Sequence, residues 1–378
     1  MTQLPTFDPG FSTLEMTEVF GPDQRVKALL AFEAALAATE AEVGLIPNAA
    51  ASEIVRACGA FSGDAPSIIA STWENGTPLI SLLDGIKEQL TDESARWVHH
   101  GATTQDAVDT ASMLQLKAGL AALERLVTTV AGRLAELAGV HRTTPMMGRT
   151  FLQTARPTTF GVRVAQWLEP LTRALTDLRE VAASLPVQLG GPVGILAPFG
   201  EEATLVVESL AAKLGLGVPV IPWHTDRSYV IRPVAVAEII AIAMGKIGTD
   251  LALLAQSDVA EIKMRPGKSS SMAGKRNPID ASRAVAAASA CLAAASSLRS
   301  GHGQELERGI GGWHLEWWSV PLVFQAAAAS VEAIDAALAR LEVDTERMTS
   351  QAEEIDAATL ASAAALVARV LDATREVL

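Results

Sequence analysis

The sequence predicts an all-α protein built as an elongated bundle of long helices. Alanine and leucine dominate the 378 residues and aromatic residues make up only 4%, so helix formers outnumber strand formers. Several segments also keep a helical spacing of apolar residues over long stretches. A helix of about 30 residues is roughly 45 Å long, so rods of this kind predict an elongated molecule.

Residues 1–105 predict a small helical domain. An irregular arm is expected over residues 1–20, where prolines and a glycine interrupt regular structure. A helix follows from about Pro22 to Val43 and is ended by Gly44. We expect two or three shorter helices up to about Leu90.

Residues 106–342 predict the long-helix bundle. Their first helix keeps apolar residues at steps of three and four for more than three heptads, which is typical of a packed seam. Further helices are expected at about 158–185, 233–262, 279–299 and 320–341. The 233–262 helix is apolar on most of its circumference, more than one neighbour can cover, and this predicts a homo-oligomer, with a tetramer preferred. The seam consists of Met113, Leu116, Leu120, Leu123, Val127, Val130, Leu134 and Leu137.

Residues 343–378 predict a short helical cap that contains one amphipathic helix. The net charge of −13 disfavours nucleic acid or an anionic membrane as a partner. The N-terminus has no basic region followed by an apolar one, so no secretory signal is predicted. No membrane span is predicted either, because charged residues interrupt the most apolar segment, 234–261. Cys58 and Cys291 have no metal-ligand spacing and predict buried thiols in a reduced compartment, so we expect a cytoplasmic protein.

Three polar stretches interrupt the long helices, and the most informative spans residues 267–278. Glycines and a proline keep it out of regular helix. Taken alone, a small, basic stretch of this kind also fits a flexible linker. With the other two stretches beside it, an anion-binding loop is the better interpretation. Its polar side chains are Lys268, Ser269, Ser270, Ser271, Lys275, Arg276 and Asn277.

The second stretch, 97–110, places Thr103 and Thr104 at the start of the seam helix, with Asp106 as a cap. Free backbone N–H groups and two hydroxyls make a carboxylate site at a helix start. An ordinary cap explains one threonine and the aspartate, but gives no reason for His99. His99 and its neighbour His100 are therefore candidates for a site, with surface exposure as the alternative.

The third stretch, 146–161, places Arg149 and Gln153 in an irregular, proline-bounded turn. Arginine offers two hydrogen bonds to a carboxylate and glutamine adds a neutral donor. The alternative for Arg149 is a pair with a surface acid. Farther on, residues 222–229 add His224 and Arg227, whereas 313–318 predicts packing rather than chemistry.

The sequence contains no Walker loop, dinucleotide fingerprint or metal-ligand spacing of His and Cys, so no cofactor and no metal are expected. Many hydrogen-bond donors without a metal indicate proton transfer beside a carboxylate. Fixed dipoles and cations would hold the negative charge that develops.

Residues 269–278, Ser-Ser-Ser-Met-Ala-Gly-Lys-Arg-Asn-Pro, resemble the Gly-Ser-Ser-x-Met-Pro-x-Lys-x-Asn-Pro signature of the fumarase/aspartase superfamily. The stretches around His99 and Arg149 resemble its two other shared regions and occur in the family's order. The resemblance covers about residues 15–340. It implies an all-α homotetramer whose core contains helices from four subunits, with active sites built from three subunits.

Within the superfamily, the sequence is most similar to the bacterial 3-carboxy-cis,cis-muconate cycloisomerases. Fumarases and adenylosuccinate lyases usually place a catalytic histidine after the position of Thr150, whereas this chain has Phe151, and the cycloisomerases have an apolar residue there. The sequence departs from the signature at Lys268 and Ala273, where the family has glycine and proline. Thr104 replaces a serine, and 228–229 is Ser-Tyr where an acid and an arginine are expected.

The resemblance implies a cofactor-independent cycloisomerase that interconverts a substituted muconate and its muconolactone during the breakdown of aromatic compounds. The family's serine matches Ser269, with Ser270 as the next choice, and His99 or Tyr229 is an alternative proton carrier. The enolate-like charge is assigned to Lys275 and Asn277 with Thr103 and Thr104. The signature also includes Met272, and we assign substrate anchoring to Arg149, Gln153, His224 and Arg227.

Two other functions remain open from the sequence. One is a superfamily lyase that releases fumarate from a succinyl substrate, as adenylosuccinate lyase does. The other is a non-catalytic scaffold of this fold. The sequence leaves open whether the substituent on the muconate is a carboxylate or another anion such as sulfonate, and whether the addition is syn or anti.

Overall fold

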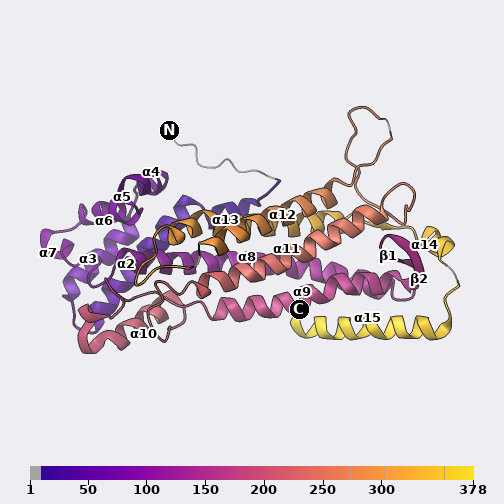
Figure 1. The fold of residues 1–378 in the computed structure, drawn as a ribbon. Coiled ribbons are helices and arrows are strands. Elements are labelled where there is room, and N and C mark those ends of the chain that lie inside the picture. The colour runs from indigo at the N-terminus through magenta and orange to yellow at the C-terminus, as the bar shows by residue number, and fades with distance from the viewer. Residues whose placement is uncertain (1–9, 273, 302, 353) are drawn as a thin grey trace.

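The computed structural model describes residues 10–272, 274–301, 303–352 and 354–378. Predictions for residues 1–9 and the departure at Ala273 lie outside this part of the chain. Long helices run side by side through most of the molecule, with short helices at one end and a β-hairpin at the other (Figure 1). The predicted all-α, long-helix fold class is confirmed.

Five long helices form the bundle, and the first contains the whole predicted seam. The seam helix has 37 residues, so it spans roughly 55 Å from end to end. Seven of its eight seam side chains are buried in one continuous core, and Leu137 packs partly buried against that core. The third helix ends at Leu254, short of the predicted residue 262. The five helices are α8 (Thr104–Val140), α9 (Phe160–Ala183), α11 (Ser228–Leu254), α12 (Ile279–Ser300) and α13 (Gly312–Leu338).

A second hydrophobic core lies at the end where α8 begins. Helix α2 matches its prediction, with Pro22 at its first turn. Four helices, α3 to α6, occupy the region for which two or three were expected. They are short because proline and glycine recur between them. The elements at this end are α1 (Leu14–Val19), α2 (Pro22–Glu42), α3 (Asn48–Ala60), α4 (Ala65–Ala70), α5 (Thr72–Asn75), α6 (Leu79–Lys87), α7 (Asp92–Ala95), the short η1 (Ala197–Glu202) and α10 (Ala203–Leu214).

The expectation of an irregular structure over residues 146–161 is wrong, because this stretch forms a hairpin of β1 (Pro145–Thr150) and β2 (Gln153–Thr159). Phe151 and Leu152 form the turn with φ values of 50° and 62°, as a two-residue hairpin turn of the primed type requires. Such turns usually contain asparagine or glycine, so the Phe-Leu pair gave no signal in the sequence.

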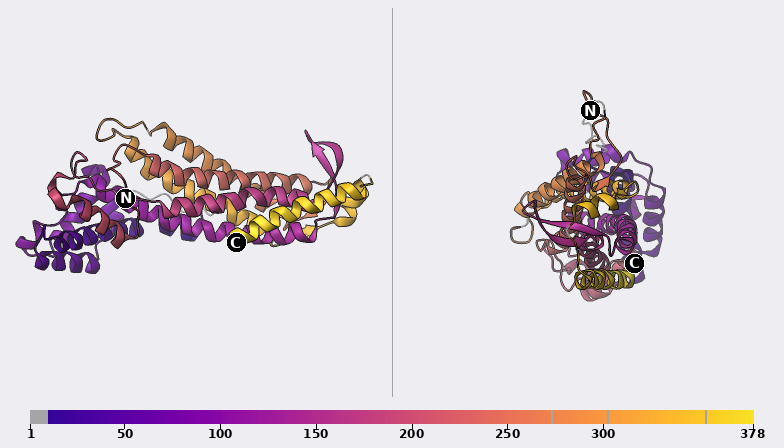
Figure 2. Two further views of the ribbon diagram at one scale, coloured as in Figure 1. Left: turned by 90° about the horizontal axis from the view of Figure 1, so that it is seen from below. Right: turned by 90° about the vertical axis from the view of Figure 1, so that its right-hand side faces the viewer.

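After α13 the chain reaches the hairpin end of the molecule and then returns along the bundle. The short strands β3 (Ile262–Lys263) and β4 (Glu342–Val343) pair, and α14 (Thr345–Gln351) lies close to the hairpin. Helix α15 (Ala357–Val377) then runs back beside α9 (Figures 1 and 2). The predicted domain boundaries at residues 105 and 342 stay predictions.

Among the described residues, three helices are long and apolar enough, by length and composition alone, to cross a membrane: α12, α13 and α15. The prediction of no candidate span was therefore too narrow, because it weighed only the charged residues of 234–261. In the bundle, α12 and α13 pack along each other and against α11. Of the most apolar 18-residue segment of each helix, 44% is buried in α12, 67% in α13 and 17% in α15.

Candidate active site

Asp106 joins three segments of the chain at the start of α8. The backbone N–H groups of Thr103 and Gly191 both donate to its Oδ2 atom, each at 2.9 Å. Nε2 of His224 lies 2.7 Å from its Oδ1 atom, and the Gln188 side chain donates to the same oxygen at 3.1 Å. The predicted cap at Asp106 is confirmed, and its buried carboxylate fixes the loop that presents Thr103.

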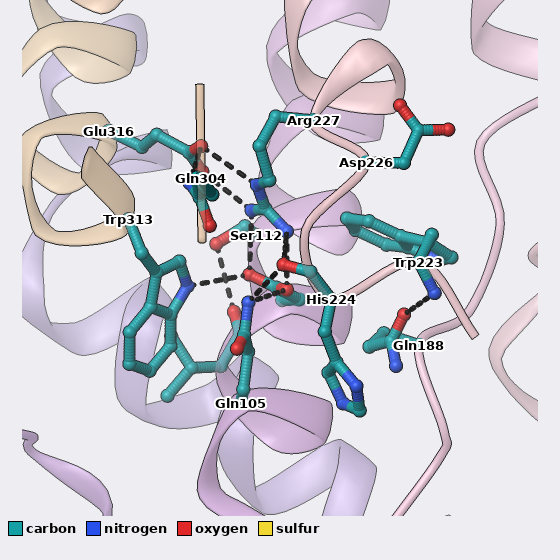
Figure 3. A network of polar contacts seen from close by, with 12 residues as sticks. Gln105, Ser112, Gln188, Trp223, His224, Asp226, Arg227, Gln304, Trp313 and Glu316 are labelled. Carbon is teal, nitrogen blue, oxygen red and sulfur yellow. Dashed lines mark hydrogen bonds and ion pairs between the residues drawn. The ribbon is translucent and has the colours of Figure 1, made fainter. Parts of the chain in front are cut away.

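Arg227 lies at the centre of a buried ion-pair network with Asp109 and Glu316 (Figure 3). Its guanidinium makes two hydrogen bonds to Asp109, at 2.7 and 2.9 Å, and two to Glu316, at 2.6 and 2.8 Å. A further bond of 3.3 Å goes to the backbone carbonyl of His224. These contacts use all five N–H groups of the guanidinium.

Trp313 closes the other side of this network. Its indole N–H donates to Asp109 at 2.8 Å, and the Trp223 ring lies 5.0 Å from the guanidinium carbon of Arg227, within the range of a cation–π contact. The two carboxylates raise the pKa of Arg227 although burial works against its charge. The predicted packing role of residues 313–318 fits this geometry.

His99 and His100 each contact a glutamate of α2. Nδ1 of His99 lies 2.7 Å from Oε1 of Glu33, and Nδ1 of His100 lies 2.6 Å from Oε1 of Glu40. Both carboxylates are buried. Burial, and then the neighbouring Glu33, raise the pKa of Glu40 to about 8, so Glu40 is largely protonated at neutral pH.

At the far end of α8, Arg149 pairs with a buried carboxylate. Its guanidinium makes two hydrogen bonds to Glu261, at 2.9 and 3.0 Å. The competing interpretation of Arg149 foresaw an acidic partner, but Glu261 is completely buried rather than on the surface. Gln153 and Phe151 lie exposed beside it, Phe151 with 99% of its surface accessible at the hairpin tip.

The loop over residues 267–278 is closed at its base and exposed at its tip. The N–H of Gly267 donates to the carbonyl of Asn277 at 2.9 Å. Within the loop, Oγ of Ser269 accepts from the N–H of Met272 at 3.0 Å. Lys275, Met272 and Ser270 are exposed, so the chain presents cationic, hydroxyl and thioether groups outward.

The predicted site residues fall into two groups at opposite ends of the bundle. The first, near the start of α8, contains His99, Thr103, Thr104, His224 and Arg227. The second, near the hairpin, contains Arg149, Gln153, Ser269, Ser270, Met272, Lys275 and Asn277. Because α8 separates the ends by roughly 55 Å, one chain does not bring them together.

The sequence did not reveal the acidic partners Glu33, Glu40, Asp109 and Glu261. Glu33 and Glu40 are seven residues apart on the apolar helix α2, so both occupy one face of it. Charged residues on a helix face that packs into the core indicate buried ion pairs. This pattern in the sequence could have identified Glu33 and Glu40 as partners of buried groups. Glu261 follows the end of α11 and has no such pattern.

Within the described ranges, no group of three or more His, Cys, Asp or Glu side chains has a geometry suited to a metal ion. Both cysteines are buried, and burial raises the pKa of each thiol to about 12.

Comparisons with known proteins place the whole length of the chain beside one family of enzymes. A protein-family model described as lyase matches residues 12–291. The 3-carboxy-cis,cis-muconate cycloisomerase of Pseudomonas aeruginosa is 38% identical over 90% of this chain and 76% of its own length. That of Pseudomonas putida is 36% identical over 98% of this chain and 90% of its own length.

Solved structures extend the likeness to three dimensions. The crystal structure of 3-carboxy-cis,cis-muconate lactonizing enzyme from Pseudomonas putida superimposes with a TM-score of 0.90 at 29% identity. The match covers 99% of this chain and all of that chain.

Proposed function

The chain belongs to the lyase family that its residues 12–291 match, of the fumarase/aspartase type, and on this premise we propose that it is a cycloisomerase. It interconverts 3-carboxy-cis,cis-muconate, or a similarly substituted muconate, and its muconolactone. The observation behind this proposal is the agreement between its relatives' activity and the apolar Phe151 at the hairpin tip. The reaction belongs to the breakdown of aromatic compounds.

The reaction closes a five-membered ring. One carboxylate oxygen of the diene diacid bonds to a carbon of the neighbouring double bond, and the π electrons move toward a second carboxylate. The resulting enolate-like charge is neutralised when a proton reaches the adjacent carbon. Because ring closure is intramolecular, the enzyme has to hold the reactive conformer and stabilise the charge on the second carboxylate.

Residues from both ends of the bundle supply these functions. Lys275 and Asn277 stabilise the developing charge together with Thr103 and Thr104, which add hydroxyls at the start of α8. Ser269, or Ser270 as the second choice, exchanges the proton, with His99 as the alternative carrier. Arg149, Gln153 and Met272 contact the remainder of the substrate.

Arg227 and His224 act by positioning. All five N–H groups of Arg227 are used within the chain, and His224 is buried against Asp106. This differs from the expectation that both side chains contact substrate. Together they hold the segment that carries Thr103 and Thr104.

The site is shared between subunits of a homotetramer in this proposal. The separation of the two residue groups along α8 supports it, since copies running antiparallel would bring opposite ends together. Ile239 and Ile242 of α11 are 44% and 54% exposed, as expected for a helix that awaits further neighbours. A cytoplasmic location and independence of cofactors are parts of the same proposal.

A panel of substituted muconates tests the function. Loss of diene absorbance in the ring-closing direction and a muconolactone in the product NMR spectrum are expected. The carboxy-substituted muconate should be the best substrate, and heavy water in the assay would reveal the face that receives the proton. No turnover with any muconate would contradict the proposal and revive the scaffold alternative.

The rival activity is release of fumarate from a succinyl substrate. The exposed Phe151 disfavours it, because related lyases usually place a proton-transferring histidine there. Measuring fumarate beside diene absorbance separates the two: fumarate from adenylosuccinate or another succinyl compound, without lactone formation, would support the lyase.

A further inference from the structure

A buried glutamate of α2, Glu33, contacts the ring of His99. Glu33 extends from α2 with only 1% of its surface accessible, and its Oε1 atom accepts from Nδ1 of His99 at 2.7 Å. The second oxygen, Oε2, is also buried and has no hydrogen-bond partner within the described part of the chain. Among the described residues, the ion pair of this carboxylate is with the His99 ring.

The second ring nitrogen of His99, Nε2, has no hydrogen-bond partner among the described residues. Nε2 is buried, although the ring as a whole keeps 14% of its surface accessible. An unpaired buried N–H is costly. His99 also has a positive φ of 60°, a conformation that non-glycine residues rarely adopt. Both the unpaired Nε2 and the positive φ cost free energy, and both belong to the orientation in which the ring is held.

The charges around His99 favour its protonated form. Glu33 of α2 and Asp106 of α8 act on it with negative charge, and the positive charge of Lys87 of α6 has a smaller, opposing effect. Burial by itself lowers the pKa of His99, but the charge and hydrogen bond of Glu33, together with the charge of Asp106, raise the pKa above the ordinary value. The neighbouring pair behaves differently: burial lowers the pKa of His100.

We propose that Glu33 is a positioning residue that keeps His99 protonated and turns its Nε2–H toward the anionic substrate. The histidine then donates from Nε2 to a carboxylate of the bound molecule, beside Thr103 at the start of α8. This inference rests on the proposed function. It explains why α2 carries a buried carboxylate whose hydrogen bond, within the described residues, goes to His99, far from α2 in the sequence.

The kinetic test compares Glu33→Gln with a matched change at Glu40. Glutamine can still accept from Nδ1 but no longer stabilises the imidazolium. The pH profile of kcat/KM reports the ionisable groups of the free enzyme. Its alkaline limb is expected to move to lower pH by about 1–3 units, because removing one close opposite charge lowers the pKa of His99 by this amount. Glu40→Gln, which alters the pair with His100 on the same helix, should leave that limb in place.

A conservative variant and a spectroscopic readout complete the design. Glu33→Asp keeps the charge and should shift the limb less than Glu33→Gln; if the glutamine variant does not fold, the aspartate variant and the wild type suffice. An NMR titration of the histidine rings, with His99 assigned through His99→Gln, should show His99 titrating above His100 in the wild type and lower in either Glu33 variant.

The titration requires no substrate, so it separates this inference from the proposed function. One outcome is that the wild-type protein turns over no muconate and still shows a raised His99 titration that Glu33→Gln abolishes. That result would contradict the proposed function but support the charge pair. An unmoved alkaline limb in active Glu33→Gln, or a His99 that titrates no higher than His100, would overturn the inference.

Discussion

Arg149 and Glu261 join the β-hairpin to the segment that leads into the 267–278 loop. Two hydrogen bonds of 2.9 and 3.0 Å connect them, and Glu261 is completely buried. Both sides of the pair bear predicted site residues: Gln153 follows on the hairpin, and Ser269 follows in the loop. The ion pair therefore fixes the strand that carries Gln153, the proposed substrate anchor, against the segment that leads to Ser269, the proposed proton-transfer residue.

Arg149→Ala should destabilise the protein by about 3–5 kcal/mol, because it leaves the Glu261 charge buried and unpaired. Urea unfolding measures the loss, and Arg173→Ala, which breaks an exposed pair with Glu169, should cost at most about 1 kcal/mol. The double variant Arg149→Ala/Glu261→Ala should lose less than the sum of the single variants. Simple additivity would show that the two side chains are not coupled.

Arg227→Lys tests the positioning role. Lysine retains the charge but lacks the planar fork that reaches Asp109 and Glu316 together, so we expect a stability loss of about 1–3 kcal/mol for each hydrogen-bond acceptor left unsatisfied. The KM for muconate, measured well below the melting temperature, should change little. A large rise in KM at unchanged stability would instead indicate direct contact with the substrate.

Lys275→Met should lower kcat by about 10²–10³, the usual effect of removing one donor that stabilises a developing anion. Its exposed position predicts an unchanged melting temperature. Lys268→Met removes the same charge from the same loop and serves as the control. Equal losses in both variants would mean that the overall charge of the loop matters rather than Lys275 itself.

Ser269→Ala should reduce kcat by about 10²–10⁴ if this hydroxyl exchanges the proton. Ser270→Ala is the next choice, and Ser271→Ala is a control with the same chemistry one residue farther on. Single-turnover kinetics with purified protein separate the chemical step from product release. Full turnover in both of the first two variants would exclude a serine and favour His99.

Glu40 predicts a specific dependence of stability on pH. Its folded-state pKa of about 8 lies above the ordinary value of 4.5 for a glutamate, so between these values the folded protein keeps a proton that the unfolded chain has lost. This contribution is fully present below pH 4.5 and is lost as the pH rises toward 8, by up to about 1.4 kcal/mol for each pH unit. Urea unfolding across this window should show the slope relative to Glu40→Gln, and parallel curves would contradict the prediction.

The sequence predicted the bundle well because its helices are long and strongly periodic. The seam of α8 and the start of α2 at Pro22 follow from local spacing and a helix-initiating proline. The hairpin was missed because Phe151 and Leu152 adopt positive φ angles that neither residue type signals. A local sequence pattern predicts an element when its residue types favour one conformation. Phe151 and Leu152 do not favour the turn conformation that they adopt, so the pattern did not predict the hairpin.

For the candidate site, the sequence by itself determined which residue types occur and in which order: the serine loop, the arginine stretch and the threonines at the helix start. Only the tertiary structure decided which charges meet. Glu33 with His99, Asp109 with Arg227 and Glu261 with Arg149 are each separated by scores of residues, and no local pattern relates them. They pair because burial makes an isolated charge too costly, so packing of the helices selects the partners.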